Sequence, residues 1–311
     1  MGVHNLNKFI SEKCKKIIKS IKMDCLSNKT IVVDISIYLY KFDSMESGSL
    51  FENIYLMLSV FKYYNIQPIF IFDGKSGTIK SKTLEKRKKI KHNNINKLDN
   101  LSYIYENIDK KSDEGIKISK DLNKLKKKIV WMTKDKINKV KRLIQYFEYS
   151  YFESPEESDG YCVQMVNNGK AWGCLSDDTD MFVYGCKRVL RNFNMINHSI
   201  ELYDMNLILN ELNINQDNFL KVCILSGTDY TDKIFNINKS FELFNEYIRS
   251  NSDEDFYIWL LKNDVCIDSA VKNGYEHYKS INCFTLIGNN TKLNNDVDIN
   301  TLIYEEGFIF I

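Results

Sequence analysis

The sequence predicts an α/β fold in which a mostly parallel central sheet is flanked by helices. Short apolar runs have the length and composition of buried strands, and they span residues 30–33, 68–72 and 171–175. Helical patterns alternate with them, at residues 35–40, 50–64 and 162–166. Because alternating strands and helices form the repeating unit of a parallel sheet, we expect the strands to lie side by side.

Other patterns extend this architecture. Apolar residues from Leu6 to Ile21 keep the spacing of one helix face, with lysines mostly opposite, which predicts an amphipathic first helix. Residues 189–193 and 199–203 predict two strands of a hairpin, and the chain from residue 216 onward is expected to be helical. No pattern over residues 271–311 assigns an element there.

Residues 80–145 differ from the segments on either side. They are rich in lysine, poor in strand patterns and weakly periodic, with helix-like stretches around residues 122–130 and 137–147. A segment this long within a compact domain is usually functional or disordered. We therefore expect a mobile, basic helical insertion above the sheet rather than a separate core.

The formal charge of +2 conceals an uneven distribution along the chain. Two basic blocks contrast with acidic residues that gather at the ends of apolar runs. The blocks are Lys75, Lys80, Lys82, Lys86, Arg87, Lys88, Lys89 and Lys91, then Lys124, Lys126, Lys127, Lys128, Lys134, Lys136, Lys139, Lys141 and Arg142. Basic surface beside an acidic pocket suits a polyanion held around a metal site. The alternative is that these lysines only solvate helix faces.

Composition excludes several classes of protein. Of the 311 residues, 44% are apolar and only two are proline, so collagen-like and proline-rich disordered chains do not fit. The apolar stretches are too short to span a bilayer, so no membrane partner is expected. The eight cysteines form no C-x-x-C pair, and the histidines show no zinc spacing. Without a signal peptide, a reduced intracellular compartment is expected.

Acidic residues follow the predicted strands. Asp34, Asp73, Asp178 and Asp180 all come after apolar runs, and ligands of open α/β sheets bind beyond the carboxyl ends of the strands. Asp178 and Asp180 are two residues apart, so in extended chain they point to the same side. Two further acidic segments, at a loop-to-helix junction and after an apolar helical run, are residues 154–159 and 226–230.

Carboxylates gathered in this way repel one another, and burying several of them without cations is costly. Hard divalent cations resolve the conflict, because Mg²⁺ prefers oxygen ligands and a pair of ions about 4 Å apart can activate water and stabilise a leaving oxygen. The pattern therefore predicts a metal-dependent phosphodiesterase site. The alternative, that each acid is a helix N-cap, suits single positions better than the whole set.

These motifs resemble the flap endonuclease family of structure-specific 5′ nucleases, over roughly residues 1–235. The similar segments are residues 1–6, 31–40, 70–75, 154–159, 175–180 and 223–230. Any one of these motifs is weak evidence alone, whereas the series in this order and spacing is specific. The resemblance implies the PIN-like nuclease fold.

The resemblance also implies roles for individual residues. Two Mg²⁺ ions, with Mn²⁺ as a substitute, would be held by Asp34, Asp73, Glu157, Asp159, Asp178, Asp180 and Asp229. Lys80 and Arg87 would be catalytic, neutralising the scissile phosphate and the charge that develops on it. Gly2 would lie close to the active site, and Tyr40 would stack on a nucleobase near the cut. Lys128, in the second basic block, is expected to contact nucleic acid.

The chain departs from the family at three places. Cellular members usually have glutamate where Asp159 stands. In the hairpin that grips duplex backbone, Asn236 and Asn238 replace both expected glycines, and asparagine tolerates positive φ well enough to permit a similar turn. The sliding-clamp peptide of the family is absent, so no clamp partner is inferred.

The expected function is hydrolysis of DNA phosphodiesters at 5′ flaps or single-strand/duplex junctions, in the nucleus or at another site of DNA replication such as a viral factory. The rivals are an RNA-directed or purely 5′→3′ exonucleolytic enzyme of the same fold, and a non-catalytic nucleic-acid-binding scaffold. The expected segments are nuclease residues 1–79, the insertion 80–145, nuclease and helical duplex-binding residues 146–270, and an unassigned extension 271–311.

Overall fold

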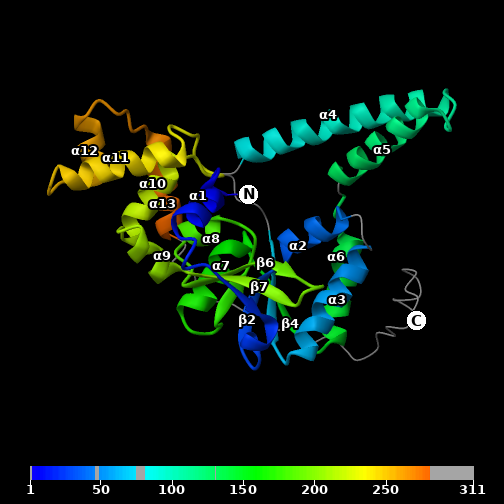
Figure 1. Ribbon diagram of the computed structural model, residues 1–311, viewed down its shortest axis with the longest axis horizontal. Coiled ribbons are helices and arrows are strands. Elements are labelled where there is room, and N and C mark those ends of the chain that lie inside the picture. The colour runs from blue at the N-terminus through cyan, green and yellow to red at the C-terminus, as the bar shows by residue number, and fades with distance from the viewer. Residues whose placement is uncertain (1, 46–48, 75–80, 130, 281–311) are drawn as a thin grey trace. The chain divides into compact units, whose positions relative to one another are not determined.

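The computed structural model describes residues 2–45, 49–74, 81–129 and 131–280 (Figure 1). The described chain divides into two compact units. The first comprises residues 2–35, 59–74 and 149–280. The second comprises residues 36–45, 49–58, 81–129 and 131–148.

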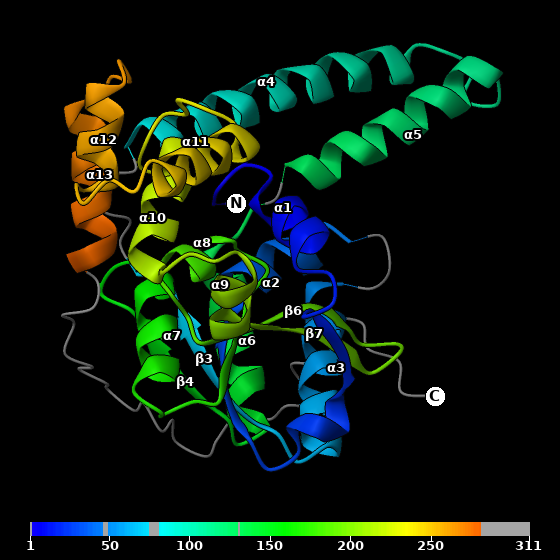
Figure 2. The same cartoon turned by 60° about the vertical axis from the view of Figure 1, so that its left-hand side comes forward.

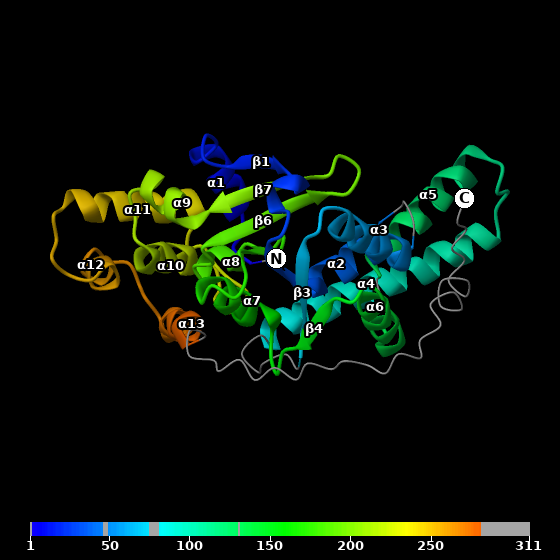
Figure 3. The same ribbon diagram turned by 90° about the horizontal axis from the view of Figure 1, so that it is seen from below.

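A sheet of seven described strands forms the centre of the first unit. The strands are β1 (Lys19–Lys22), β2 (Thr30–Asp34), β3 (Gln67–Phe72), β4 (Ser150–Glu153), β5 (Gly173–Leu175), β6 (Arg188–Asn194) and β7 (Ser199–Asp204). Their order is β1-β7-β6-β5-β2-β3-β4. The strands from β6 to β4 in this order are parallel. β7 pairs antiparallel with β6, and β1 pairs antiparallel with β7; Figure 3 shows these three strands together. The predicted fold class is confirmed, although β1 and β4 were not predicted.

The central strand β2 aligns the acidic ends of its neighbours. Its residues Ile31, Val32 and Val33 are fully buried, as in a strand that is covered on both faces. Asp34 pairs with Ile71 of β3, and Val33 pairs with Leu175 of β5. The segments that leave β2, β3 and β5 therefore start at the same edge of the sheet.

The sequence predicts helices of the first unit near residues 6–13 and 158–167 and between residues 216 and 270, but not the short helices at residues 23–26, 180–183 and 205–211. The described helices of this unit are α1 (Leu6–Lys13), η1 (Met23–Leu26), α7 (Ser158–Asn167), α8 (Asp180–Val183), α9 (Met205–Glu211), α10 (Gln216–Leu225), α11 (Ile237–Arg249), α12 (Phe256–Lys262) and α13 (Ser269–Ser280). Four cysteines of the core, Cys162, Cys174, Cys186 and Cys223, are buried free thiols. No helix in the described residues is long and apolar enough to cross a membrane.

The first helix is shorter than predicted. α1 ends at Lys13, and the residues around Ile21 form the edge strand β1 instead of further helical turns. In β1, Ile21 lies opposite Ile200 of β7. The apolar spacing fitted a helix, but pairing with β7 satisfies the backbone groups that a sheet edge leaves open, and this tertiary contact overrides the local pattern.

The second unit is helical. Its helices are α2 (Ile35–Asp43), α3 (Leu50–Tyr63), α4 (Ser81–Glu106), α5 (Asp113–Lys128) and α6 (Lys134–Tyr146), of which α3 ends in the first unit. Figures 1 and 2 show α4 and α5 side by side. α4 was not predicted, because its polar sequence carries little of the apolar periodicity that marks a helix. α5 starts well before the predicted stretch, where the Ser112 side chain accepts the Gly115 N–H at 3.0 Å.

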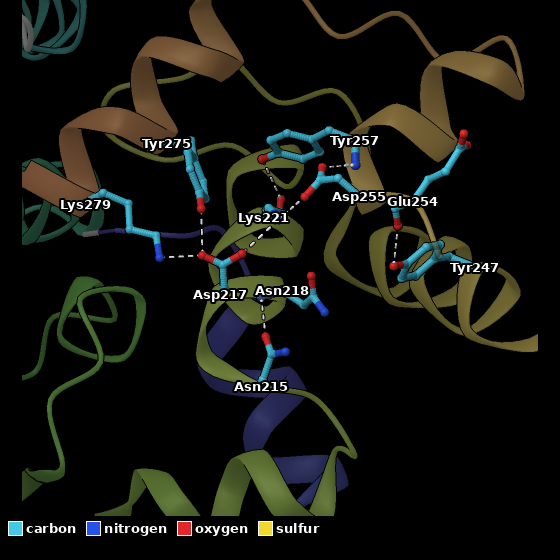
Figure 4. Close-up of polar contacts among 10 residues, drawn as sticks. All are labelled: Asn215, Asp217, Asn218, Lys221, Tyr247, Glu254, Asp255, Tyr257, Tyr275 and Lys279. Carbon is cyan, nitrogen blue, oxygen red and sulfur yellow. Dashed lines mark hydrogen bonds and ion pairs between the residues drawn. The ribbon is translucent and has the colours of Figure 1, made fainter. Parts of the chain in front are cut away.

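A buried lysine joins three helices of the first unit (Figure 4). Lys221 of α10 contacts Asp217 Oδ2 at 2.8 Å and Asp255 Oδ2, at the start of α12, at 2.5 Å. From α13, the Tyr275 hydroxyl donates to Asp217 Oδ1 at 2.6 Å, and Lys279 pairs with the same carboxylate. These five residues, Asp217, Lys221, Asp255, Tyr275 and Lys279, form a lysine network that fastens α12 and α13 to α10.

Candidate metal centre

The edge of the sheet at which β2, β3 and β5 end carries several of the predicted ligands and is called the acidic edge below. Asp34, at the end of the central strand β2, lies on this edge. It is 2% exposed. Its Oδ1 accepts a hydrogen bond from Ser158 Oγ at 3.0 Å, and its Oδ2 accepts one from Ser176 Oγ at 2.9 Å. Burial raises the pKa of Asp34 to about 8, and the charges of Asp73 and Asp178 contribute, against the lowering effect of the two serines. Asp34 thus lies within electrostatic reach of two other predicted ligands.

Asp73 is held beside the loop that precedes α7. Its Oδ1 accepts the backbone N–H of Ser158 at 2.8 Å. The next residue, Gly74, donates its N–H to the carbonyl of Glu156 at 2.6 Å. A Cβ at position 74 would collide with the Ser154 carbonyl, so this close approach of two backbones requires glycine.

Asp178 and Asp180 come together through a turn. β5 ends at Leu175, and Asp178 Oδ1 accepts the backbone N–H of Asp180, the first residue of α8, at 3.0 Å. The expectation that both acids point the same way from an extended strand was therefore wrong in its geometry. Both side chains nevertheless converge, because the turn directs their Oδ1 atoms toward Gly2.

Gly2 lies directly against this pair. Its φ is +77°, in the left-handed region that favours glycine. A Cβ at this position would lie 2.5 Å from Oδ1 of both Asp178 and Asp180, and it would collide with Thr179 Oγ1. The amino terminus therefore approaches the acids as closely as a backbone without a side chain permits.

Glu157, Asp159 and Asp229 are the remaining predicted ligands. Glu157 directly precedes α7, and its Oε2 accepts a hydrogen bond from the Tyr230 hydroxyl at 2.6 Å. Asp159 is buried in the first turn of α7. Asp229 is half-buried and precedes Tyr230, so the same hydrogen bond brings its loop to the start of α7.

Sequence reasoning missed several side chains that hold these acids. Ser158 and Ser176 lie inside the acidic motifs, so their proximity to ligands was a usable signal. Tyr278 of α13 carried no such signal, yet its hydroxyl donates to Asp180 Oδ2 at 3.2 Å. Burial, with the charge of Asp180, raises the pKa of Tyr278 well above its ordinary value, so the hydroxyl keeps its proton.

The other predicted site residues belong to the second unit or lie outside the described residues. Tyr40 is exposed on α2. The backbones of Arg87 and Lys128 lie in α4 and at the end of α5. Lys80 falls outside the described residues.

The segment before α11 differs from the expected turn. Asn236 has φ −78° and ψ 161°, and its side chain accepts the Lys239 N–H at 2.9 Å. Asn238 lies within α11. Asn236 therefore caps the helix rather than supplying a left-handed turn, because an N-cap asparagine satisfies a backbone donor that would otherwise be left open. The left-handed position of this loop is Gly227, with φ +85°.

The chemistry of this edge fits a hard divalent cation. All seven predicted ligands are carboxylates, the donor class that Mg²⁺ and Mn²⁺ prefer. The proximity of Asp73 and Asp178 to buried Asp34 is a charge conflict that a cation would relieve. Within the described residues, no three His, Cys, Asp or Glu side chains are grouped tightly enough to hold one ion as they stand. The support for a divalent cation is therefore the carboxylate chemistry of the predicted ligands, together with the absence of a side chain at Gly2 beside Asp178 and Asp180.

Two family models match the chain. The XPG N-terminal domain matches residues 1–94, and the XPG I-region matches residues 148–229. Flap endonuclease 1 of Methanococcus aeolicus is 29% identical over 278 residues, which cover 80% of each chain. Flap endonuclease 1 of Entamoeba dispar is 29% identical over 79% of this chain and 68% of that protein. The probable RAD2-like endonuclease 369L of invertebrate iridescent virus 6 is 27% identical over 78% of this chain and 71% of that protein.

Solved structures show the same fold. The catalytic core of Rad2 in complex with DNA substrate has a TM-score of 0.63 at 20% identity, covering 89% of this chain and 86% of that one. The flap endonuclease-1 of Methanococcus jannaschii has a TM-score of 0.52 at 21% identity, covering 85% and 96%.

The parallel sheet with its acidic edge is that of a PIN-like nuclease. The two matched models together span more than half of the sequence, and the relatives carry the same assignment. The chain belongs to the XPG/Rad2-type flap endonuclease family, and it is a structure-specific 5′ nuclease.

Proposed function

We propose that this nuclease cuts DNA at 5′ flaps and single-strand/duplex junctions, using two Mg²⁺ ions held by the seven predicted carboxylates. The observation that carries the proposal is the bridge formed by Ser158, whose hydroxyl contacts Asp34 and whose N–H contacts Asp73. This bridge joins ligands from two strand ends. Asp178 lies near enough to Asp34 for its charge to act on that carboxylate.

The ions would supply an activated water and stabilisation of the leaving oxygen. The protein's own residues would fix where that chemistry happens. Asp34, held on both oxygens by serines, cannot rotate freely and would anchor the ligand set. Gly2, without a side chain, lets the backbone lie directly against Asp178 and Asp180.

The second unit would supply the contacts to the free strand. Lys80 and Arg87 would stabilise the charge that develops on the scissile phosphate, and Tyr40 would stack on a base. Basic residues of the insertion, Lys128 among them, would hold the 5′ single strand by contacts with its phosphates. Cleavage should therefore weaken steeply with added salt. We place this activity where 5′ flaps arise, at sites of DNA replication or repair.

The test is cleavage of labelled DNA in a panel of flap, nicked, blunt and RNA substrates, with Mg²⁺ or EDTA. We expect the 5′ flap to be cut preferentially and only with metal. Asp178→Ala should abolish cleavage, whereas Asp253→Ala, which alters an exposed aspartate far along the chain, should not. Cleavage that persists in EDTA or in Asp178→Ala would refute the metal mechanism. Preference for RNA or for blunt ends would identify the alternative exonuclease, and metal-independent binding without turnover would identify a scaffold.

A further inference from the structure

Three tyrosines, Tyr184, Tyr230 and Tyr278, form a cluster in which the last described helix meets the loops that carry predicted ligands. The rings of Tyr184 and Tyr278 lie 4.6 Å apart, and those of Tyr230 and Tyr278 lie 5.3 Å apart at right angles. The hydroxyls of Tyr184 and Tyr230 are 3.3 Å apart. Tyr184 directly follows α8, Tyr230 follows Asp229, and Tyr278 lies on α13, so three separate parts of the chain meet here.

Two hydroxyls of this tyrosine cluster contact predicted ligands. Tyr278 donates to Asp180 Oδ2 at 3.2 Å in a fully buried setting. Tyr230 donates to Glu157 Oε2 at 2.6 Å. Each of these hydrogen bonds involves only one of the two carboxylate oxygens. In Asp180 the other oxygen, Oδ1, is directed toward Gly2. The hydroxyl of Tyr278 thus fixes the rotation of the Asp180 carboxylate, with one oxygen directed toward Gly2.

Contacts on other parts of α13 hold Tyr278 in this position. Gly274, one turn earlier, packs so closely on Thr231 that a Cβ would collide with its methyl group. On another part of the same helix, Tyr275 and Lys279 bind Asp217 of α10 within the lysine network (Figure 4). The close approach and the network together fix the height and rotation of α13.

We propose that Tyr278 is a positioning residue of the metal centre, through which α13 orients Asp180 for cation binding. The proposal rests on the proposed metal site. A hydrogen bond from outside the ligand set fixes the orientation of a ligating carboxylate, and losing such a bond typically lowers metal affinity or activity about 10–100-fold. Tyr230 acts on Glu157 in the same way. The last described helix is therefore part of the active centre as well as of the fold.

The test compares Tyr278→Phe with Tyr275→Phe in the full chain. Both variants remove one hydroxyl from α13, but only the first removes a bond to a predicted ligand. Two quantities are measured: the Mg²⁺ concentration for half-maximal flap cleavage, and Mn²⁺ binding without DNA by calorimetry. For Tyr278→Phe we expect both to weaken about 10-fold. The KM for DNA should not change, and Tyr275→Phe should bind metal like the wild type.

Unchanged Mn²⁺ binding by Tyr278→Phe would overturn the proposal, as would an equal loss in Tyr275→Phe, since the effect would then come from docking of α13. The proposed function can fail separately. If the wild type binds Mn²⁺ more tightly than Tyr278→Phe but cuts no DNA, the positioning role of Tyr278 stands and the flap nuclease proposal fails. If the wild type cuts and the variant binds metal normally, only the positioning role fails.

Discussion

The hydroxyl of Ser158 lies 3.0 Å from Asp34 Oδ1, while the backbone N–H of the same serine holds Asp73. Ser158→Ala would remove the first bond and keep the second. We expect Asp34 to lose one orienting bond, so that the Mg²⁺ requirement rises about 10-fold while the enzyme still folds and cuts.

A magnesium titration of flap cleavage checks this expectation. Ser252→Ala, which changes a serine in the loop between α11 and α12 that contacts none of the predicted ligands in the described hydrogen bonds, serves as the control. An unaltered Mg²⁺ requirement in Ser158→Ala would show that the hydroxyl does not orient Asp34.

Gly2→Ala should be more damaging to activity than to stability. Alanine would be strained at φ +77°, and its Cβ would press on Asp178 and Asp180. The displaced acids should lower kcat by about 100-fold, a size typical of lost positioning at a catalytic centre. Left-handed backbone at a single non-glycine residue costs on the order of 1 kcal/mol, so the free energy of unfolding by urea should fall by no more than about that amount. Parallel measurement of kcat and of the urea midpoint distinguishes this from general unfolding, which would lower both.

The sequence predicts site residues that belong to a local motif, but it does not predict contacts between residues that are far apart in the chain. Asp34, Asp73 and Asp178 follow apolar runs, so strand ends and carboxylates could be predicted together there. The bond from Tyr278 to Asp180 spans 98 positions and leaves no mark in either segment. α4 escaped detection for another reason: its polar residues lack the periodic apolar face by which helices are recognised. The helix at Ile21 was predicted wrongly because pairing with β7 decides that segment.

The raised pKa of Asp34 makes the metal-free protein sensitive to pH. The pKa rises from 3.8 to about 8 on folding, so the folded state binds a proton more tightly than the unfolded state. The resulting stability is complete below about pH 4 and is lost as the pH rises toward 8, with at most about 1.4 kcal/mol per pH unit from this group.

Urea unfolding in EDTA at pH 5, 6.5 and 8 measures this loss. We expect stability to decline with pH, Mg²⁺ to reverse the decline at pH 8, and Asp34→Asn to flatten it. A wild-type profile as flat as that of Asp34→Asn would rule out Asp34 as the source.

The lysine network should have the opposite effect on the pH dependence of stability, because it should lose its contribution as the pH falls. Burial alone would raise the pKa of Asp217, but hydrogen bonds from Lys221, Lys279 and Tyr275 outweigh it and hold the pKa well below its usual range. The stability gained from these bonds is therefore complete above about pH 5 and is lost as the pH falls below 4. Lys221→Met should destabilise the protein at pH 7 by about 1–3 kcal/mol, less than a fully buried pair would, because Asp217 and Asp255 regain water.

Hydrogen exchange should localise that loss to α12 and α13, since the network fastens both helices to α10. Lys239→Met, which breaks an exposed pair with Glu242, is the matched control and should change stability by less than about 1 kcal/mol. Between pH 4 and 2 the wild type should lose stability faster than Lys221→Met, because only the wild type still has the Lys221 bonds to lose. Parallel acid profiles for the two proteins would mean that Asp217 is not held in its charged form by Lys221.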